Sequence, residues 1–438
     1  MTSTVAKHSA LPPLAADQFD VGSTDDSLER LVAAASAGGD VFRIYAPGRK
    51  SETWIVNNPA DIRRVLVTNH RNYTKGQGID RVRILLGDGI MTSEGAAWRR
   101  ARRMIQPMFH RRMIERFGEV IEASVARGLA DWQAAAARHE IINLSEALRG
   151  LTLDIILRAV FGADLDELIA RTGRNPFTLV AEDPSRDLRF AYRFRSLRRL
   201  ILELIARRRA DAEERFDLFG LMIAARDKDD GQPLSDAEVV DEVVTLIVAG
   251  HETSASALNW TWYLLANHPQ AAERLHAEVD AISLPLAPRI AEAEQLHYTQ
   301  AVIQEAMRLY PPGWLLTRRT LEADELSGFR VPPATDVMLS PYLIHRHPDH
   351  WPEPERFLPE RFLGAGPHPR DRWIYIPFAA GPRHCVGESF ALHELTLHVA
   401  RVARQLRLEY LDDGPVELEA AINLRARRDL RMRPVTRH

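Results

Sequence analysis

Helical periodicity dominates the pattern of apolar and polar residues along the chain. Apolar positions that recur every three to four residues predict helices, and short alternating runs predict strands. Helices are expected over residues 60–67, 98–109, 113–140, 144–161, 185–215, 235–267, 270–282, 292–309 and 386–405. Two strands are expected around a Pro-Gly turn within 40–57, short strands within 311–341, and mostly loop over 76–95. The pattern therefore predicts a mainly α fold with small β-sheets and no βαβ alternation.

The chain reads as one continuous unit. Its 438 residues contain no internal repeat, no low-complexity block and no composition shift that would mark a linker. Length alone would allow two or three domains, but a chain without a recognisable linker favours one. We therefore expect a single domain over residues 23–438, preceded by a flexible segment over residues 1–22.

Charge and cysteine content limit the partners and the compartment. The 57 basic and 60 acidic residues leave a formal charge of −3, which indicates no nucleic-acid partner. No stretch reaches the roughly 18 consecutive apolar residues of a membrane span, and residues 1–20 lack the apolar run of a signal peptide. One cysteine excludes an intramolecular disulfide and multi-thiolate zinc or iron–sulfur sites. These features predict a cytoplasmic protein without a membrane anchor.

Cys385 stands in the most informative segment of the chain, Phe378 to Gly387. Two glycines and a proline predict a tight loop that leads into a helix, whose free N–H groups and dipole stabilise a thiolate. Arg383 can present a bidentate guanidinium to a carboxylate, and Phe378 can shield the sulfur from water. These features fit a haem iron ligated by Cys385, with the haem propionates as carboxylates. A buried structural cysteine is the alternative.

This segment resembles the haem-binding loop of the cytochrome P-450 family, which has the pattern Phe-x-x-Gly-x-Arg-x-Cys-x-Gly. Every fixed position of that pattern is present, as Phe378, Gly381, Arg383, Cys385 and Gly387. The resemblance extends over the chain from about residue 39 onward. It implies the cytochrome P-450 fold, in a single haem-binding domain, and one haem b whose axial iron ligand is Cys385.

A long helix carries the second motif. A capping box at Ser235 starts it, and Pro269 ends it. Polar residues interrupt its apolar run at 250–253, and in a buried helix such residues need partners. The hydroxyl of Thr253 can bond back to a main-chain carbonyl and bend or widen a turn; a Thr that only bends the helix is the alternative.

Residues 249–253 also match the family pattern Ala/Gly-Gly-x-Asp/Glu-Thr. The resemblance implies that Ala249 borders the haem and that Thr253 orients oxygen and water. It implies that Glu252 helps to relay protons, which is general-acid work in kind.

Further charged residues match the family at other positions. Glu305 and Arg308 share a helix face at i, i+3. The resemblance implies that they form a buried structural triad with Arg361, in which losing one partner should be severe. An overlapping motif makes Arg356 a rival third member, and the spacing to the cysteine loop favours Arg361.

Cations are also expected for the haem propionates. Trp98 and Arg102 lie at i, i+4 and match the Trp-x-x-x-Arg of the family's propionate-binding helix, although simple packing of the pair is the alternative. Arg318 is a further candidate. We favour it over its neighbour Arg319, but the pattern alone does not decide which of the two turns inward.

The resemblance implies a haem-thiolate monooxygenase that activates O2 and hydroxylates or epoxidises an apolar small molecule. A terpenoid, a fatty acid and an aromatic metabolite all fit, and we favour a terpenoid. The expected pocket lining is 76–90, 177–194, 248–249, 314–316 and 422–424. Oxidative coupling, desaturation, peroxide-driven oxygenation and a non-catalytic haem sensor remain as alternatives. The pair Glu252–Thr253 argues against the last two.

Electrons would come from outside the chain, which is expected to be a monomer. The resemblance implies a ferredoxin or flavodoxin with its reductase as the donor. Arg99, Arg100 and Arg103 would offer such an acidic partner a basic surface, although a solvated helix face is the default interpretation.

Overall fold

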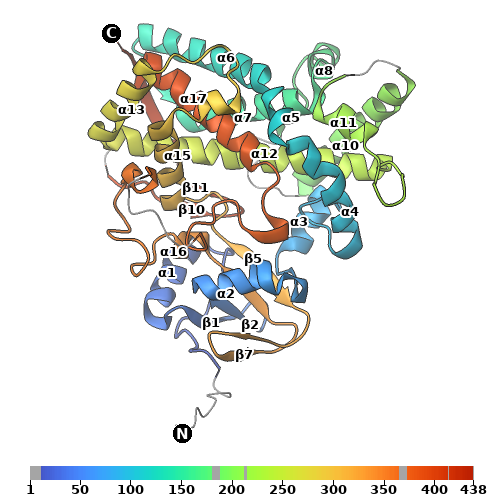
Figure 1. Cartoon of the computed structure of the whole chain (residues 1–438), viewed down its shortest axis with the longest axis vertical. Coiled ribbons are helices and arrows are strands. Elements are labelled where there is room, and N and C mark those ends of the chain that lie inside the picture. The colour runs from blue at the N-terminus through green and yellow to red at the C-terminus, as the bar shows by residue number, and fades with distance from the viewer. Residues whose placement is uncertain (1–10, 180–187, 212–214, 365–371, 413, 438) are drawn as a thin grey trace. The chain divides into compact units, whose positions relative to one another are not determined.

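Helices hold most of the chain, as the periodicity predicts, and the sheets are small (Figure 1). The computed structural model describes residues 11–179, 188–211, 215–364, 372–412 and 414–437. They form two compact units that interleave along the chain. Unit 1 comprises the segments Met1–Ile79, Gln304–Cys385 and Val416–Arg427, and unit 2 comprises Asp80–Ile303, Val386–Pro415 and Arg428–His438. Each unit has buried apolar clusters of its own, and the single domain over 23–438 stays a prediction.

Unit 1 contains most of the strands. Its elements are α1 (Ser27–Gly38), β1 (Val41–Ala46), β2 (Ser51–Val56), α2 (Pro59–Arg63), the π-turn η1 (Arg64–Thr68), η2 (His70–Asn72), β3 (Tyr73–Lys75), β5 (Leu316–Thr320), β6 (Asp324–Leu326), β7 (Phe329–Val331), β8 (Asp336–Leu339), α16 (Pro341–Ile344), η4 (Pro359–Phe362), η5 (Gly381–Arg383), β10 (Leu418–Ala420) and β11 (Leu424–Ala426). Helix α15 (His297–Leu309) runs across the boundary at residue 304.

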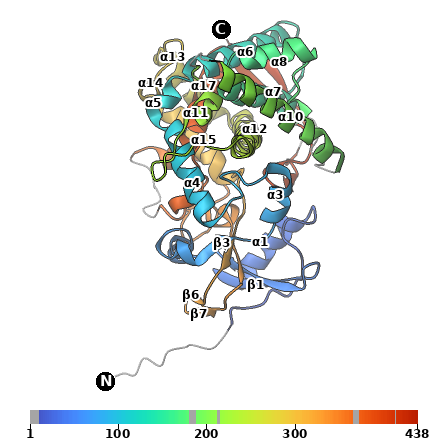
Figure 2. The same cartoon turned by 90° about the vertical axis from the view of Figure 1, so that its right-hand side faces the viewer.

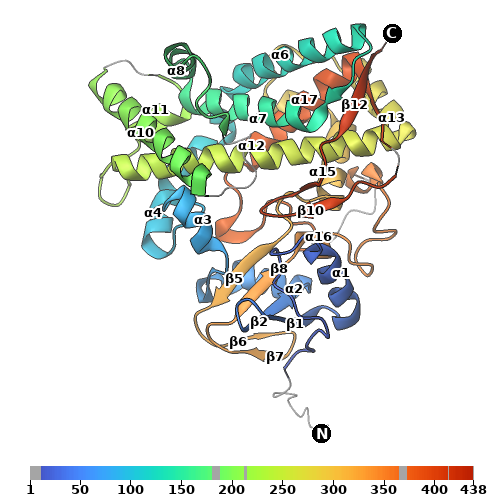
Figure 3. The ribbon, with the colours of Figure 1, turned by 180° about the vertical axis from the view of Figure 1, so that it is seen from behind.

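A five-stranded sheet in the order β1-β2-β8-β5-β3 is the centre of unit 1 (Figure 3). Most neighbours are antiparallel, but β2 and β8 run parallel, with Thr53 opposite Asp336. Parallel neighbours cannot be joined by a tight turn, and here about 280 residues separate them along the chain. The N-terminal part of the chain therefore completes its sheet only with strands from the C-terminal half.

Unit 2 is mainly helical. Its elements are α3 (Ile79–Leu86), α4 (Gly95–Ile105), η3 (Gln106–Phe109), α5 (Arg111–Glu115), α6 (Gly118–Ala137), β4 (Ile142–Asn143), α7 (Leu144–Phe161), α8 (Asp164–Thr172), α10 (Leu188–Ala210), α11 (Leu218–Ala224), α12 (Asp236–Asn267), α13 (Pro269–Ala281), α14 (Ile290–Ala293), α17 (Glu388–Gln405), β9 (Leu406–Tyr410) and β12 (Arg431–Thr436). Strands β4, β12 and β9 form its antiparallel sheet.

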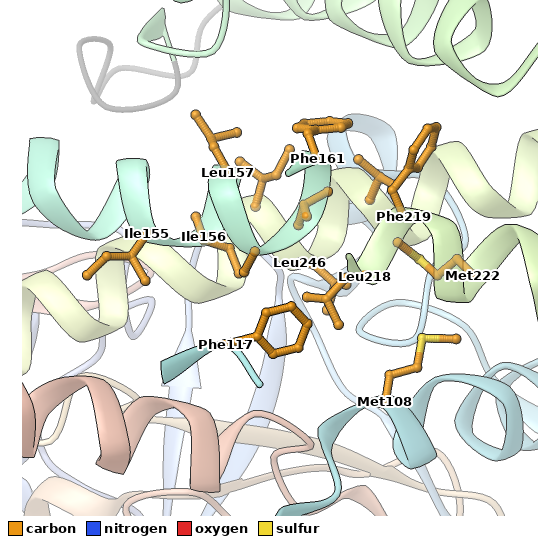
Figure 4. Packing of buried hydrophobic residues seen from close by; sticks show 14 of the residues in the cluster. Met108, Phe117, Ile155, Ile156, Leu157, Phe161, Leu218, Phe219, Met222 and Leu246 are labelled. Carbon is orange, nitrogen blue, oxygen red and sulfur yellow. The ribbon is translucent and has the colours of Figure 1, made fainter. Parts of the chain in front are cut away.

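Helix α12 is the central element of unit 2, and Figure 2 shows it end-on with α7 and α10 beside it. Its apolar residues join a large buried cluster. Figure 4 shows Ile156 of α7, Leu218 of α11 and Phe117 gathered around Leu246 of α12. Gly250 lets α7 approach closely, because a Cβ added there would lie 3.0 Å from Ile156. This packing fixes the helix that carries the second motif.

Several predicted boundaries agree with the structure and others are wrong. The expected mainly α fold with small sheets is confirmed, and α7 has the predicted bounds. The predicted helix 113–140 is two helices, because the N–H of Phe117 bonds to Ile114 O in a tighter turn that buries the Phe117 ring. The predicted helix 292–309 is likewise divided into α14 and α15. The segment 76–95, expected to be mostly loop, contains α3.

Some expectations fall partly outside the described residues. Of the predicted flexible segment 1–22, residues 1–10 lie outside the described part; in the remainder, Leu14 pairs with Arg43 of β1, and Phe19 and Val21 are buried in unit 1. Residues 185–187 and 212–214 of the predicted helix 185–215 lie outside it too, as do residues 180–187 of the predicted pocket lining. Among the helices that can be described, we find none with the length and hydropathy needed to span a membrane.

Candidate active site

Cys385 is the last residue of a tight loop in unit 1. The loop is closed by two main-chain hydrogen bonds of 3.0 Å, from Cys385 N–H to Phe378 O and from His384 N–H to Gly381 O. The thiol of Cys385 is exposed. Helix α17 begins at Glu388 with Gly387 as its N-cap, slightly later than the predicted start at Val386. The loop thus places an exposed cysteine on a hydrogen-bonded frame.

Gly381 fixes where this loop sits in unit 1. Its φ of +73° is in the left-handed region, and a Cβ added there would lie 2.0 Å from the carbonyl oxygen of Leu66 in η1. No side chain can be accommodated at that distance from a main-chain atom. The family motif therefore has a physical cause here, since only glycine allows the loop to rest on η1.

The donor set of the loop fits a haem. A thiolate is a soft ligand that suits haem iron, and Cys385 is exposed and forms no disulfide. Arg383 lies in η5, two residues before the cysteine, and carries a fixed positive charge. Among the described residues, no group of three or more His, Cys, Asp and Glu side chains has the arrangement of a separate metal site.

The two candidate arginines of β5 differ in burial. Side chains alternate between the faces of a strand, so the neighbours Arg318 and Arg319 point to opposite sides. Arg318 is 7% exposed and donates to Thr317 O at 2.8 Å, whereas the side chain of Arg319 is 51% exposed and lies 3.9 Å from Asp336. The buried neighbour, Arg318, is the one that the sequence interpretation favoured.

Trp98 and Arg102 lie one turn apart on α4 of unit 2, and both are half-buried. The guanidinium of Arg102 donates from Nε to Gln106 Oε1 at 2.9 Å. Arg102 places a permanent cation one turn from Trp98 on α4, which makes the pair a candidate for anion binding.

Glu305, Arg308 and Arg361 are brought together inside unit 1. Arg308 binds the carboxylate of Glu305 in a bidentate manner, because its Nε donates to Oε2 at 2.6 Å and its Nη2 donates to Oε1 at 2.8 Å. Arg361 donates from Nε to the same Oε1 at 3.3 Å. All three are buried, and burial lowers the pKa of Arg361. The rival Arg356 has a side chain that is 63% exposed and pairs with Glu353. The buried third member is therefore Arg361.

His345 connects this triad to the cysteine loop, and sequence reasoning missed it. Its main-chain oxygen accepts from Arg308 Nη1 at 2.8 Å, and its ring Nε2 accepts from the N–H of Ile376 at 2.9 Å. Burial lowers the pKa of His345 to about 3, so the ring is neutral and can act as an acceptor. Ile376 O in turn accepts from Ala379 N–H at the start of the loop. Nothing in the local sequence around His345 signals this link.

Helix α12 carries the second motif as its sequence predicts. Ser235 and Glu238 form the capping box, and Thr253 Oγ1 donates to Ala249 O at 2.7 Å. The helix remains α-helical through this turn, so the hydroxyl bonds back without widening it. Most of the central part of α12 is buried, but Ala249 is exposed and Glu252 and Thr253 are half-buried. A carboxyl and a hydroxyl are thus accessible at one point of a core helix.

A second carboxyl lies behind this point, and the sequence motifs do not include it. Glu394 of α17 is buried and accepts from Ser254 Oγ at 2.9 Å. Burial raises the pKa of Glu394 to about 8, so its neutral form predominates at pH 7. A glutamate at i, i+9 from the cysteine gives no recognisable local signal.

The predicted basic surface on α4 needs correction. Arg100 lies 2.5 Å from Glu238 and 3.4 Å from Asp227, and Arg103 lies 3.0 Å from Asp227 and 2.8 Å from Asp229. Because these acids compensate both cations, the exposed Arg99 is the member of the three that remains for an acidic partner. Sequence alone could not place the loop 227–229 beside α4.

Comparisons with known proteins agree with these motifs. A family model described as Cytochrome P450 matches residues 12–424. The chain is 36% identical to cyclooctatin synthase of Streptomyces melanosporofaciens over 93% of this chain and 91% of that protein. It is 32% identical to cyclooctat-9-en-7-ol 5-monooxygenase of the same organism (86% and 84%) and 31% identical to pentalenene oxygenase of Streptomyces avermitilis (93% and 92%).

Proposed function

The chain belongs to the cytochrome P450 family, and we propose that it oxidises a cyclic terpenoid with Cys385 as the iron ligand of its haem b. As a member of this family it is an oxidoreductase, a monooxygenase acting on an apolar small molecule. The bound haem would supply the activation of O2: one oxygen atom enters a C–H or C=C bond of the substrate, and the other leaves as water with two protons and two electrons from an external donor.

The haem would be held by the cysteine loop and by the arginines proposed for its propionates. The Cys385 thiolate would ligate the iron and Phe378 would shield the sulfur. Gly381 allows the loop to rest on η1, and Gly387 is the N-cap of α17 that follows it. Cations bind the two propionates, and the candidates are Arg102 with Trp98, Arg318 and Arg383. The triad Glu305–Arg308–Arg361 has a structural role, because its buried pairs hold the chain behind the loop.

Thr253 and Glu252 would handle protons, with Ala249 bordering the haem. The Thr253 hydroxyl uses its hydrogen in the bond to Ala249 O, so its lone pairs are available to accept from water. Glu252 is half-buried and can exchange protons between bulk water and that position. The observation that supports this role is that these polar groups are accessible within the mostly buried central part of α12.

The substrate class rests on the relatives. Their names contain an unsaturated hydrocarbon, pentalenene, and an alkene with one hydroxyl, cyclooctat-9-en-7-ol. Both are apolar, as ligands of cytochrome P450 pockets are expected to be. We infer hydroxylation or epoxidation of a related polycyclic hydrocarbon or alcohol. A ferredoxin or flavodoxin with its reductase would supply electrons to a monomeric, cytoplasmic enzyme.

A spectrum and a substrate screen test this proposal. We expect the reduced protein under carbon monoxide to give the strongly red-shifted Soret band of a thiolate-ligated haem. Cys385→Ala should lose that band, whereas the matched variant Thr253→Ala should keep it. Pentalenene and cyclooctat-9-en-7-ol should then shift the spin state of the ferric protein and be oxygenated. A red-shifted band that survives in Cys385→Ala would refute the ligand assignment, and binding of only fatty acids would refute the substrate class.

A further inference from the structure

Two neighbouring carboxylates of α12 hold the loop 87–93 in unit 2. Asp241 Oδ2 accepts from the N–H of Asp88 at 2.8 Å, and Glu242 Oε2 accepts from the N–H of Ile90 at 3.1 Å. The loop is closed on itself by Thr92 Oγ1, which donates to Gly87 O at 2.6 Å. Main-chain N–H groups of the loop are thus satisfied by side chains of α12.

Two glycines allow this approach. A Cβ added at Gly87 would lie 2.2 Å from Asp241 Oδ1, and one added at Gly89 would lie 2.4 Å from Thr245 Oγ1 and 2.9 Å from Asp241 O. The last of these is a main-chain atom that cannot move aside. The loop therefore rests directly on α12. After Gly89, the side chains of Ile90 and Met91 pack against the apolar cluster that contains Leu246.

Glu242 lies on the helix face that carries the second motif. Glu242, Leu246, Ala249 and Thr253 follow one another at intervals of four, three and four residues, which place all four on one face of an α-helix. Under the proposed function, Ala249 and Thr253 face the haem and substrate. The loop that Glu242 holds then continues the same wall.

Glu242 is a buried carboxyl, with 2% of the residue exposed. Within the described part of the chain it forms no ion pair, and its Oε2 accepts from the N–H of Ile90. Three other acids lie on this part of the chain, and each is paired with an arginine of another element. On α12, Asp241 pairs with Arg198 of α10 and Glu238 pairs with Arg100 of α4. On the loop, Asp88 pairs with Arg83 of α3. Burial, opposed by the bond from Ile90 and reinforced by the two acids of α12, raises the pKa of Glu242 to about 7.

We propose that Glu242 is a positioning residue that keeps the loop 87–93 closed on α12 and thereby sets the affinity for the apolar substrate. The step from loop to substrate rests on the proposed function. A closed loop keeps Glu242 buried, and an open loop lets water reach it. The closed state therefore binds the carboxyl proton more tightly. The closed–open equilibrium shifts toward the open state as the pH rises from about 4.5, the ordinary pKa of a glutamate, to about 7.

Hydrogen exchange of the haem-loaded full chain tests the closure without any substrate. With rates corrected for the intrinsic effect of pH, the peptide around 87–93 should lose protection about thirtyfold between pH 5 and pH 7 and level off above pH 7.5. Glu242→Gln keeps an acceptor for the N–H of Ile90 but cannot ionise, so its protection should not change with pH. The matched variant Asp241→Asn should keep the pH dependence with a lower midpoint. An unchanged pH dependence in Glu242→Gln would overturn the proposal.

Ligand binding at pH 7.5 tests the consequence for affinity. Glu242→Leu leaves the N–H of Ile90 without its acceptor, whereas Glu242→Gln keeps an acceptor, and neither side chain can ionise. Glu242→Leu should therefore bind 4-phenylimidazole about tenfold more weakly than Glu242→Gln, while cyanide, which needs no enclosing wall, binds equally to both. Equal 4-phenylimidazole affinity in Glu242→Leu and Glu242→Gln would overturn the role of the loop. Each variant should retain the red-shifted Soret band of the carbon monoxide complex. Loss of that band in the wild type itself would instead count against the proposed function.

Discussion

Removing the buried carboxylate of Glu305 should strongly destabilise unit 1. Its carboxylate accepts four hydrogen bonds, two from Arg308, one from Arg361 and one from the N–H of Leu358 at 2.9 Å. In Glu305→Ala two buried guanidinium groups lose their common counter-charge. Breaking a buried ion pair from one side costs about 3–5 kcal/mol. Because both arginines keep main-chain oxygens as partners, we expect a loss within that range rather than above it.

Urea unfolding followed by far-ultraviolet circular dichroism measures this loss. The total stability of a globular protein is about 5–15 kcal/mol, so Glu305→Ala should shift the midpoint strongly or prevent folding. Glu305→Gln keeps one acceptor oxygen and should be intermediate. The matched control is Glu353→Gln, which breaks the half-exposed pair with Arg356 and should cost less than about 1 kcal/mol. If Glu305→Ala unfolded within about 1 kcal/mol of the wild type, the buried triad would not be what stabilises this part of unit 1.

Three further predictions concern single residues. Gly381→Ala places a Cβ 2.0 Å from Leu66 O at a φ of +73°, so the purified protein should contain little haem; full haem content by pyridine haemochromogen assay would contradict this. Thr253→Ala should keep the Soret band but form less product per reductant consumed, and unchanged coupling would remove Thr253 from proton handling. Glu394 has a raised pKa of about 8, so its contribution to stability is complete below about pH 4.5 and is lost as the pH rises to about 8. Glu394→Gln should flatten this part of the urea midpoint against pH, and an unchanged slope would show that Glu394 is not its source.

Local signals in the sequence were enough to predict some elements. The capping box at Ser235 and the proline at 269 give the bounds of α12 directly, because helix ends are decided by nearby hydrogen bonds. The cysteine loop was also predictable, since its glycines and proline restrict the backbone over a short stretch. In both cases the interactions that decide the structure lie within a few residues.

Other features depend on contacts that are distant in sequence. The segment 76–95 is rich in glycine and is predicted to be mostly loop; α3 forms within it, and the loop after α3 is held by Asp241 and Glu242. The choice between Arg318 and Arg319 depends on which face of β5 is covered, and a motif does not contain that information. The pairing of Arg100 and Arg103 with acids near residue 227 likewise required the fold.

The parallel pairing of β2 with β8 has a consequence for biosynthesis. When the ribosome has made residue 56, the β1–β2 hairpin is complete, but β8 follows only at Asp336–Leu339. At about 5–20 residues per second, the ribosome needs roughly 15–55 s for the chain in between. An isolated hairpin is at best marginally stable, and the unpaired edge of β2 can meanwhile join strands of other chains. Overproduction of this enzyme is therefore expected to be limited during translation, and slower initiation or added chaperones should raise the folded yield more than changes near the cysteine.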